Sequence, residues 1–384
     1  MKDLEQHLLL IPGPTPVPPP VARELSRPMI AHRAPEMVEL YHRVVERLQY
    51  VFQTRADLFV LASSGTGGME AAIANTLSPG DAVLCISVGV FGDRFAKIAQ
   101  AFGMDVDVLA FEWGQAADPS AIEQKLKSGK QYKAVTLTHN ETSTAITNDT
   151  ASIAPMVREH GALFLVDCIS GMLCTDFRTD EWDCDVVVAA SQKAFMLPPG
   201  LCFVSVSPRA WEAVERAKSP RFYFDFRAMR EPAKKGQTAY TPAVGLFFGA
   251  DAALGMILRE GAEQVIARHA RLAAGVRAGV KALGLKLFSD EAHASNGVTA
   301  IVPPAGIDAD SLRALLSQRY SVVLSGGQGK LKGQIFRIAH MGAVSEKDLL
   351  GALGTLELAL SEMGHRAEPG ASVAAAVRAW TISH

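Results

Sequence analysis

The stretch VVVAASQKAFMLPPG (residues 186–200) places Lys193 directly after an apolar run that is typical of a buried strand. Burial disfavours the charged form of a lysine, so an amine at this position indicates a functional group rather than part of a core. A second apolar run, ALFLVD (162–167), ends on Asp167. Two buried strands are therefore predicted, and each carries one ionisable group at its carboxyl end.

Working outward from these runs, apolar segments alternate with segments of helical periodicity. Strands are predicted at 57–64, 82–88, 105–111, 134–140, 162–167, 185–191 and 201–208, and helices at 35–52, 67–77, 91–103, 121–129 and 153–161. Continuous apolar strands separated by helices indicate an α/β fold with a mainly parallel sheet that is covered on both faces.

The pattern changes after about residue 257. A long helix is predicted at 259–283, followed by strands at 297–303, 321–327 and 335–341 and a helix at 346–363. We therefore expect an extended Pro-rich segment (1–20), a large domain (21–257) and a smaller α+β domain (258–384). The tail from His365 has weak periodicity, which is compatible with a terminal helix or with a mobile segment.

Composition narrows the function. The chain has 384 residues, 48% hydrophobic and 20% charged, with a net charge of −2 that provides no general attraction to nucleic acid. The sequence shows neither the long apolar stretch of a signal peptide nor a membrane span, so a cytoplasmic location without membrane contact is expected.

The scattered histidines predict no metal site. The five cysteines are expected to be reduced core residues: Cys85, Cys168, Cys174, Cys184 and Cys202.

The pair Lys193 and Asp167 suits an enzyme that uses pyridoxal 5′-phosphate (PLP). The lysine forms a Schiff base with the aldehyde, and the carboxylate keeps the pyridine nitrogen protonated. A Gly-rich turn, Ser64-Gly65-Thr66-Gly67, joins a predicted strand to a helix, where backbone N–H groups and hydroxyls favour an anion. By itself this turn is equally compatible with a dinucleotide site or with a simple tight turn.

Three further features follow other predicted strands. Phe91 can stack on a planar cofactor or belong to the core, and the loop Glu141-Thr142-Ser143-Thr144 is dense in hydroxyls. Arg337 lies inside the apolar run IFRIAHMG, where it can clamp a carboxylate or form a structural ion pair. Because ligands of open α/β sheets bind at the carboxyl ends of the strands, the order of these features strengthens each interpretation.

With these residues the chain resembles the class V, fold-type I PLP aminotransferases, in particular the alanine–glyoxylate and serine–glyoxylate (serine–pyruvate) group. The resemblance covers nearly the whole chain, from residue 12 to Gly342. It is carried by PGPTPVPP (12–19), SGTG (64–67), HNETST (139–144), LVD (165–167), SQK (191–193), PPG (198–200), KGQTAYTPAV (235–244) and GGQGKLKGQIFRIAHMG (326–342). It implies a seven-stranded type of sheet in the large domain.

The resemblance also implies roles for individual residues. Lys193 would form the Schiff base and move the proton, and Asp167 would bond the pyridine nitrogen. Phe91, where the family usually has Trp, would stack on the ring. The remaining cofactor contacts would come from Ser64, Gly65, Thr66 and Gln192 at the phosphate and from Thr142 at the ring.

Substrate and partner contacts follow in the same way. Arg337 would bind the substrate carboxylate, and Gly13 would line the substrate pocket. Tyr240 and Thr241 would reach the cofactor phosphate of a neighbouring subunit, which implies a homodimer with shared active sites.

The implied reaction is ping-pong transfer of an amino group from alanine or serine to glyoxylate or pyruvate. Aspartate, ureidoglycine or a phosphonate amine as donor stays open, as do a PLP lyase and a non-catalytic partner subunit. A desulfurase is disfavoured because no cysteine follows Cys202, and Gln192 precedes the lysine where desulfurases usually have His. A nicotinamide dehydrogenase is disfavoured because the strict G-x-G-x-x-G pattern is missing.

Overall fold

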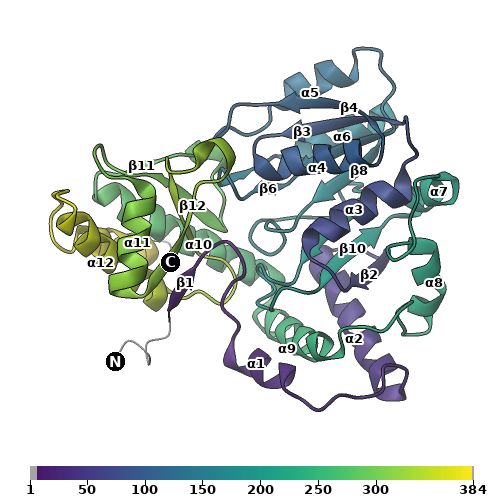
Figure 1. Ribbon diagram of the computed structural model, residues 1–384, viewed down its shortest axis with the longest axis horizontal. Coiled ribbons are helices and arrows are strands. Elements are labelled where there is room, and N and C mark those ends of the chain that lie inside the picture. Colours follow the sequence, from purple (N-terminus) through teal and green to yellow (C-terminus); the bar gives the residue numbers. More distant parts are fainter. Residues whose placement is uncertain (1–6, 383–384) are drawn as a thin grey trace.

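The structure is a computed structural model that describes residues 7–382. Expectations for residues 1–6 and 383–384, the outer ends of the N-terminal segment and of the tail, lie outside the described residues. The described chain forms a larger and a smaller lobe, each built on its own sheet (Figure 1).

The sheet of the larger lobe contains β2 (Asp57–Leu61), β3 (Ala82–Ser87), β4 (Asp105–Ala110), β5 (Ala134–Thr138), β8 (Leu163–Asp167), β9 (Val186–Ala190) and β10 (Cys202–Val206). Their spatial order is β2-β10-β9-β8-β5-β3-β4. Strand β10 is antiparallel to both of its neighbours, and the other neighbouring pairs are parallel. The prediction of an α/β fold with a mainly parallel sheet is confirmed.

Helices cover both faces of this sheet, because alternate residues of the strands point to opposite sides. One face packs against α2 (Pro35–Phe52), α5 (Pro119–Leu126), α6 (Thr150–His160) and α9 (Val244–Glu260). The other packs against α3 (Gly65–Thr76), α4 (Val90–Ala101), α7 (Pro208–Arg216) and α8 (Phe226–Lys234). The five cysteines are free and buried, as predicted.

The smaller lobe is built on a five-stranded sheet in the order β1-β13-β14-β12-β11. Its strands are β1 (Leu8–Leu10), β11 (Lys286–Leu287), β12 (Val298–Val302), β13 (Val322–Gly326) and β14 (Phe336–Ala339). Helices α10 (Ala262–Ala282), α11 (Ala309–Tyr320), α12 (Glu346–Glu362) and α13 (Ala371–Ile382) pack with it. The tail therefore forms a terminal helix, one of the two outcomes left open by its weak periodicity.

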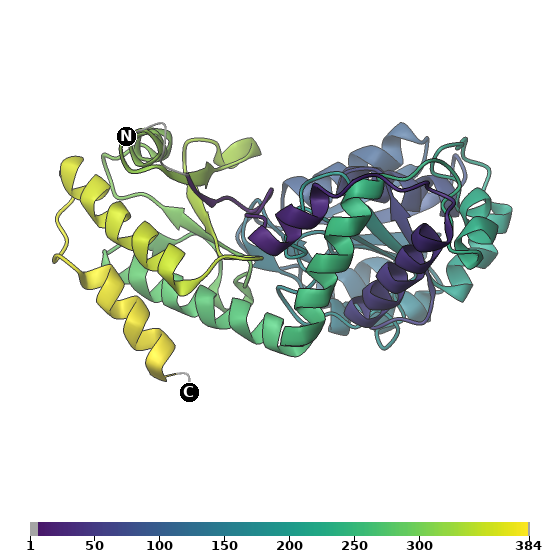
Figure 2. The same ribbon diagram turned by 90° about the horizontal axis from the view of Figure 1, so that it is seen from below.

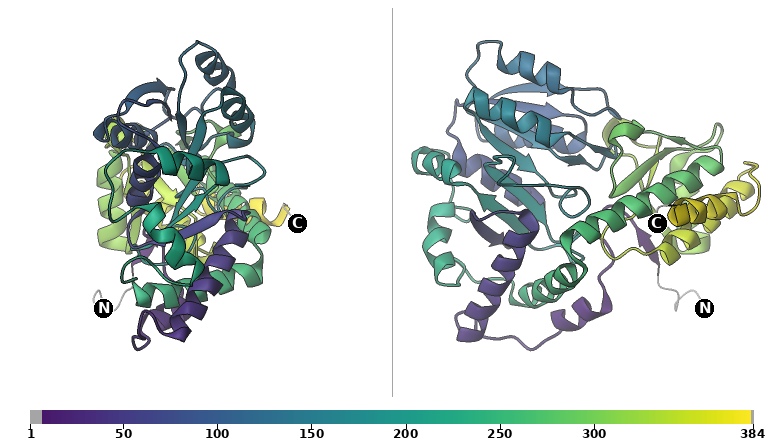
Figure 3. Two further views of the ribbon diagram at one scale, coloured as in Figure 1. Left: turned by 90° about the vertical axis from the view of Figure 1, so that its right-hand side faces the viewer. Right: turned by 180° about the vertical axis from the view of Figure 1, so that it is seen from behind.

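Helices α9 and α10 join the lobes, and Figures 2 and 3 show α10 running from the larger lobe along the smaller one. The predicted helix at 259–283 corresponds to α10, and the chain turns at Gly261, whose φ of 91° suits a residue without Cβ. Helix α9 was not predicted. It is apolar on most of its circumference, so its sequence lacks the alternation of polar and apolar faces that reveals a surface helix.

The N-terminal segment crosses between the lobes. Strand β1 pairs in parallel with β13 of the smaller sheet, and α1 (Pro19–Leu25) then lies on the larger lobe beside α9 (Figure 1). The division of the chain at residues 20 and 257 stays a prediction, although β1 shows that part of the first segment belongs to the sheet of the smaller lobe.

Candidate active site

Asp167 and Lys193 lie together at the carboxyl ends of β8 and β9, which are parallel neighbours. They line one cavity at this edge of the sheet. The other residues around it are Ser64, Gly65, Thr66, Met69, Phe91, Arg94, Asn140, Thr142, Ile169, Ser170 and Gln192. The structure thus brings together the predicted amine, carboxylate, Gly-rich turn, aromatic ring and hydroxyl loop.

Burial shifts the two ionisable groups toward their neutral forms. It lowers the pKa of the Lys193 amine to about 8, and the negative charge of Asp167 opposes that shift. Burial raises the pKa of Asp167 to about 7, partly offset by a hydrogen bond of 2.9 Å from the Ile169 backbone N–H. An amine and a carboxyl group that both titrate near neutral pH are suited to proton transfer.

The loop that carries Lys193 is held by the N-terminal segment. Thr15 donates its hydroxyl to the Lys193 carbonyl at 2.8 Å and its N–H to the Gln192 carbonyl at 3.1 Å. The lysine amine itself donates to the Pro12 carbonyl. A Cβ on Gly13 would lie 2.7 Å from the lysine Nζ, so the absence of a side chain makes room for the amine.

The turn Ser64–Thr66 forms the start of α3. The Ser64 side chain makes no hydrogen bond that caps this helix, so the first backbone N–H groups remain available to a ligand. A Cβ on Gly65 would lie 2.4 Å from Ile169, which shows how closely the turn approaches the end of β8. Nearby, the Gln192 Oε1 is buried without a hydrogen-bond partner among the described residues.

Phe91 and Arg94 stand on the same face of α4. The Arg94 guanidinium lies over the Phe91 ring, 4.8 Å from its centroid, and donates to the Thr66 hydroxyl at 3.3 Å. Arg94 was not predicted as a site residue. Its spacing of three positions from Phe91 on a predicted helix was the available signal, because residues i and i+3 share a face.

The hydroxyl loop divides its side chains between two tasks. Glu141 accepts the N–H groups of Phe91 (2.9 Å) and Gly92 (3.1 Å), and the Ser143 hydroxyl accepts that of Val90 (3.0 Å), so these two side chains cap α4. Thr142 instead faces the cavity, where its hydroxyl lies 2.6 Å from the Ser170 hydroxyl.

Ser170 and Asn140 were not predicted either. The Asn140 amide donates to the Ser170 hydroxyl at 3.0 Å, and that hydroxyl donates to the Asn140 carbonyl at 2.8 Å. Their position beside the ends of β5 and β8 was the signal, and isolated polar residues there are common enough that it was weak.

Arg337 lies on β14 of the smaller lobe and contacts Thr142, which lines the cavity. It is 4% exposed, and its guanidinium donates to the carbonyls of Gly326 (2.7 and 3.0 Å) and Thr142 (2.7 Å). Within residues 7–382 it has no ion-pair partner. The nearby Glu141 carboxyl group favours the charge of this guanidinium but forms no ion pair with it, so a substrate carboxylate would be its direct ionic partner.

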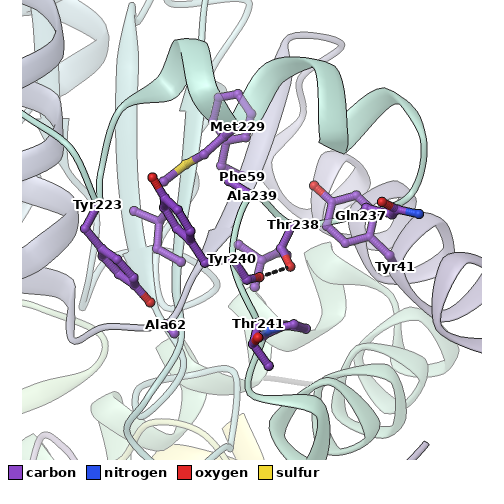
Figure 4. Close-up of a pocket in the computed structure, with 13 residues that line it drawn as sticks. Tyr41, Phe59, Ala62, Tyr223, Met229, Gln237, Thr238, Ala239, Tyr240 and Thr241 are labelled. Carbon is purple, nitrogen blue, oxygen red and sulfur yellow. Dashed lines mark hydrogen bonds between the residues drawn. The ribbon is translucent and has the colours of Figure 1, made fainter. Parts of the chain in front are cut away.

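Tyr240 and Thr241 are not in this cavity. They line a second cavity of about 450 Å³ together with Tyr41, Phe59, Tyr223 and Gln237 (Figure 4). The Tyr223 and Tyr240 rings are stacked, with centroids 5.3 Å apart, and the Phe222 ring lies 5.8 Å from Tyr240. Phe222 is 78% exposed and Tyr223 is 45% exposed, so this part of the larger lobe presents an aromatic face.

The described residues offer neither a metal site nor a membrane-spanning helix. Residues 7–382 contain no group of three or more His, Cys, Asp or Glu side chains arranged to hold a metal ion. No helix within the same range is long and apolar enough to cross a membrane.

Residues 14–340 match the sequence model of the family described as aminotransferase class-V. The chain belongs to this family. It is 43% identical to the "Soluble hydrogenase 42 kDa subunit" of Anabaena cylindrica, over 98% of this chain and 99% of that protein. It is 40% identical to the L-aspartate–glyoxylate aminotransferase of Paracoccus denitrificans (97% and 95% covered) and 38% identical to the serine–glyoxylate aminotransferase of Arabidopsis thaliana (97% and 94% covered).

Among solved structures, the ureidoglycine–glyoxylate aminotransferase of Bacillus subtilis superposes with a TM-score of 0.95 at 28% identity, over 98% of both chains. The resemblance to class V aminotransferases and the predicted fold are therefore confirmed, and the chain is a transaminase. Enzymes of this class depend on PLP, which supplies an electron sink for reactions at the α-carbon of amino acids.

Proposed function

We propose that the Lys193 cavity holds PLP and that the enzyme moves an amino group from a small L-amino acid, alanine or serine, to glyoxylate or pyruvate. The observation that carries this proposal is the buried Arg337 guanidinium, which donates to the carbonyl of Thr142, a residue that lines the Lys193 cavity, and forms no ion pair within residues 7–382. It supplies the cation that the carboxylate of a 2-amino or 2-oxo acid needs.

The residues around the cavity fit the cofactor. Lys193 would hold its aldehyde carbon, and Asp167 would accept a hydrogen bond from its pyridine nitrogen. Ser64, Gly65, Thr66 and Gln192 would bind its phosphate, Gln192 through the NH2 group of its side chain. Phe91 would stack on its ring, and Thr142 would contact the ring edge.

Electrostatics supports the role of Asp167. A buried carboxyl group whose pKa is raised to about 7 is partly protonated at neutral pH. A cationic ring nitrogen beside it lowers this pKa again, because an opposite charge favours the ionised carboxylate. The ion pair would keep the ring positively charged, which is the state in which it withdraws electrons from the substrate.

Lys193 would act as the base that removes the α-proton. Burial lowers the pKa of its amine to about 8 in the chain itself. A group with such a pKa both accepts and returns a proton at physiological pH. Gly13 leaves the space in which this amine moves.

Three arginines outside the Lys193 cavity have hydrogen-bond partners of their own within the chain. Arg227 pairs with Asp225 at 3.0 Å and Arg230 pairs with Asp57 at 3.1 Å, whereas Arg33 donates to the Gln237 amide oxygen at 2.6 Å. None of the three lines the Lys193 cavity, so none of them provides a second carboxylate site there.

We also propose that the active enzyme is a homodimer. Tyr240 and Thr241 lie in their own cavity beside the exposed aromatic face, which suits contacts to the cofactor phosphate of a second subunit. The complete set of Lys193, Asp167 and Arg337 favours a catalytic chain over a non-catalytic partner subunit. A cytoplasmic location and the lack of a resident metal remain predictions from the sequence.

The test is the visible absorbance of the purified protein during separate additions of L-serine, L-alanine, L-aspartate and ureidoglycine. We expect a cofactor band that serine or alanine converts to the aminated form and that glyoxylate or pyruvate restores. Conversion by aspartate or ureidoglycine alone would replace the proposed donor. A band that no donor changes points to a lyase or another reaction, and a protein without a band after addition of PLP contradicts the whole proposal.

A further inference from the structure

Arg94 is a cation that the proposed roles leave unused. It lies on the first turns of α4, it is partly buried, and its guanidinium faces the same cavity as Lys193. No carboxylate pairs with it within residues 7–382. Its two polar or aromatic contacts are the Thr66 hydroxyl and the Phe91 ring.

The position of Arg94 singles out one end of the cavity. Thr66 belongs to the turn at the start of α3, whose backbone N–H groups lack a side-chain cap. A guanidinium beside uncapped N–H groups forms a site for an anion, because both donate hydrogen bonds and both carry positive potential. The Arg94 hydrogen bond to the Thr66 hydroxyl aims the cation at this end rather than toward Arg337.

We propose that Arg94 completes the phosphate-binding site of the cofactor and, by lying over Phe91, fixes the ring that stacks on the cofactor. This inference rests on the proposed function, since it assigns Arg94 to the same bound molecule. The guanidinium provides a full positive charge, whereas the hydroxyls of Ser64 and Thr66 and the amide of Gln192 are neutral donors. Loss of Arg94 therefore removes a cation that contacts the phosphate turn at Thr66.

The experiment compares Arg94→Gln and Arg94→Lys with the wild type. Lys97→Gln is the matched control, because it removes an exposed cation one turn further along α4. The full-length protein is freed of cofactor and titrated with PLP by absorbance. The titration is repeated with inorganic phosphate as competitor at constant ionic strength, which yields the inhibition constant of phosphate without any measurement of catalysis.

We expect Arg94→Gln to raise both the Kd of PLP and the inhibition constant of inorganic phosphate by roughly 10-fold to 100-fold, the range for a lost charge-assisted hydrogen bond. Arg94→Lys should recover most of the loss, because it keeps the charge. Lys97→Gln should change both constants by less than about twofold, since solvent screens an exposed charge.

Three results would overturn the inference. Weaker PLP binding with an unchanged phosphate constant would mean that Arg94 acts only through Phe91. Unchanged values of both constants would mean that Arg94 has no part in cofactor binding. Unchanged constants with a raised KM for L-aspartate would make Arg94 a clamp for a second substrate carboxylate. A wild-type protein that binds no PLP overturns the proposed function itself, which separates the two failures.

Discussion

The pH dependence of cofactor capture tests whether Lys193 is the reacting amine. An amine combines with an aldehyde only in its neutral form. Burial lowers the pKa of Lys193 from its ordinary value of 10.5 to about 8. At pH 7 the amine is then neutral in roughly one molecule in ten, compared with roughly one in three thousand for an unperturbed lysine. We therefore expect capture to accelerate about tenfold between pH 7 and a plateau above pH 9.

The assay mixes cofactor-free protein with excess PLP and follows the growth of the visible band from pH 6 to pH 10. The Asp167→Asn variant tests the direction in which the carboxylate shifts the pKa of Lys193. The carboxylate raises the pKa of Lys193, so its removal should move the midpoint of the pH profile to a lower pH. A capture rate that still rises about tenfold per pH unit up to pH 10, without a plateau, would refute the buried environment of the amine. A midpoint that rises in Asp167→Asn would refute the coupling of the two groups.

Three more predictions follow from the geometry. Lys193→Ala should abolish the cofactor band and transamination while the far-UV circular dichroism spectrum is unchanged, and ordinary turnover in this variant would disprove the assignment. Arg337→Ala should raise KM by roughly 10-fold to 100-fold at unchanged cofactor content, because a charge-assisted carboxylate contact is lost. The control is Arg319→Ala, which removes a cation that is 63% exposed. Loss of the cofactor in Arg337→Ala would assign this arginine another role. Trp380→Ala should lower the free energy of unfolding by about 3–5 kcal/mol, as for other buried aromatic residues, because Trp380 is 6% exposed and its indole donates to the Arg271 carbonyl at 2.9 Å. The urea midpoint measures this loss. An effect no larger than that of the exposed Val377→Ala would show that this side chain does not hold α13 in place.

The sequence was sufficient for the elements whose pattern is local. Lys193 and Asp167 each follow a continuous apolar run, and a charged group after such a run is conspicuous without any structure. The alternation of these runs with helical periodicity was enough to predict the parallel sheet. The density of hydroxyls in the loop 141–144 predicts Thr142 as a site residue. That Glu141 and Ser143 instead cap α4 depends on contacts between distant segments, which the sequence does not show.

The residues that were missed have no local signal of comparable strength. Arg94 looks like an ordinary cation on an amphipathic helix until α4 is placed beside the turn at Thr66. Ser170 and Asn140 are single polar residues in loops, and only the neighbouring carboxyl ends of β5 and β8 bring them together. Strand β1 is three leucines long, and its partner β13 lies more than three hundred residues away, so no local rule assigns it to the smaller sheet.

The placement of β1 explains how two sheets build one site. Arg337 stands on β14 and Gly13 follows β1, two strands of the smaller sheet, whereas Asp167 ends β8 and Lys193 follows β9 of the larger one. The hydrogen bond from the Thr15 hydroxyl to the Lys193 carbonyl (2.8 Å) connects the segment after β1 to the loop that follows β9. The separation of the lysine amine and the arginine therefore depends on how the two lobes meet.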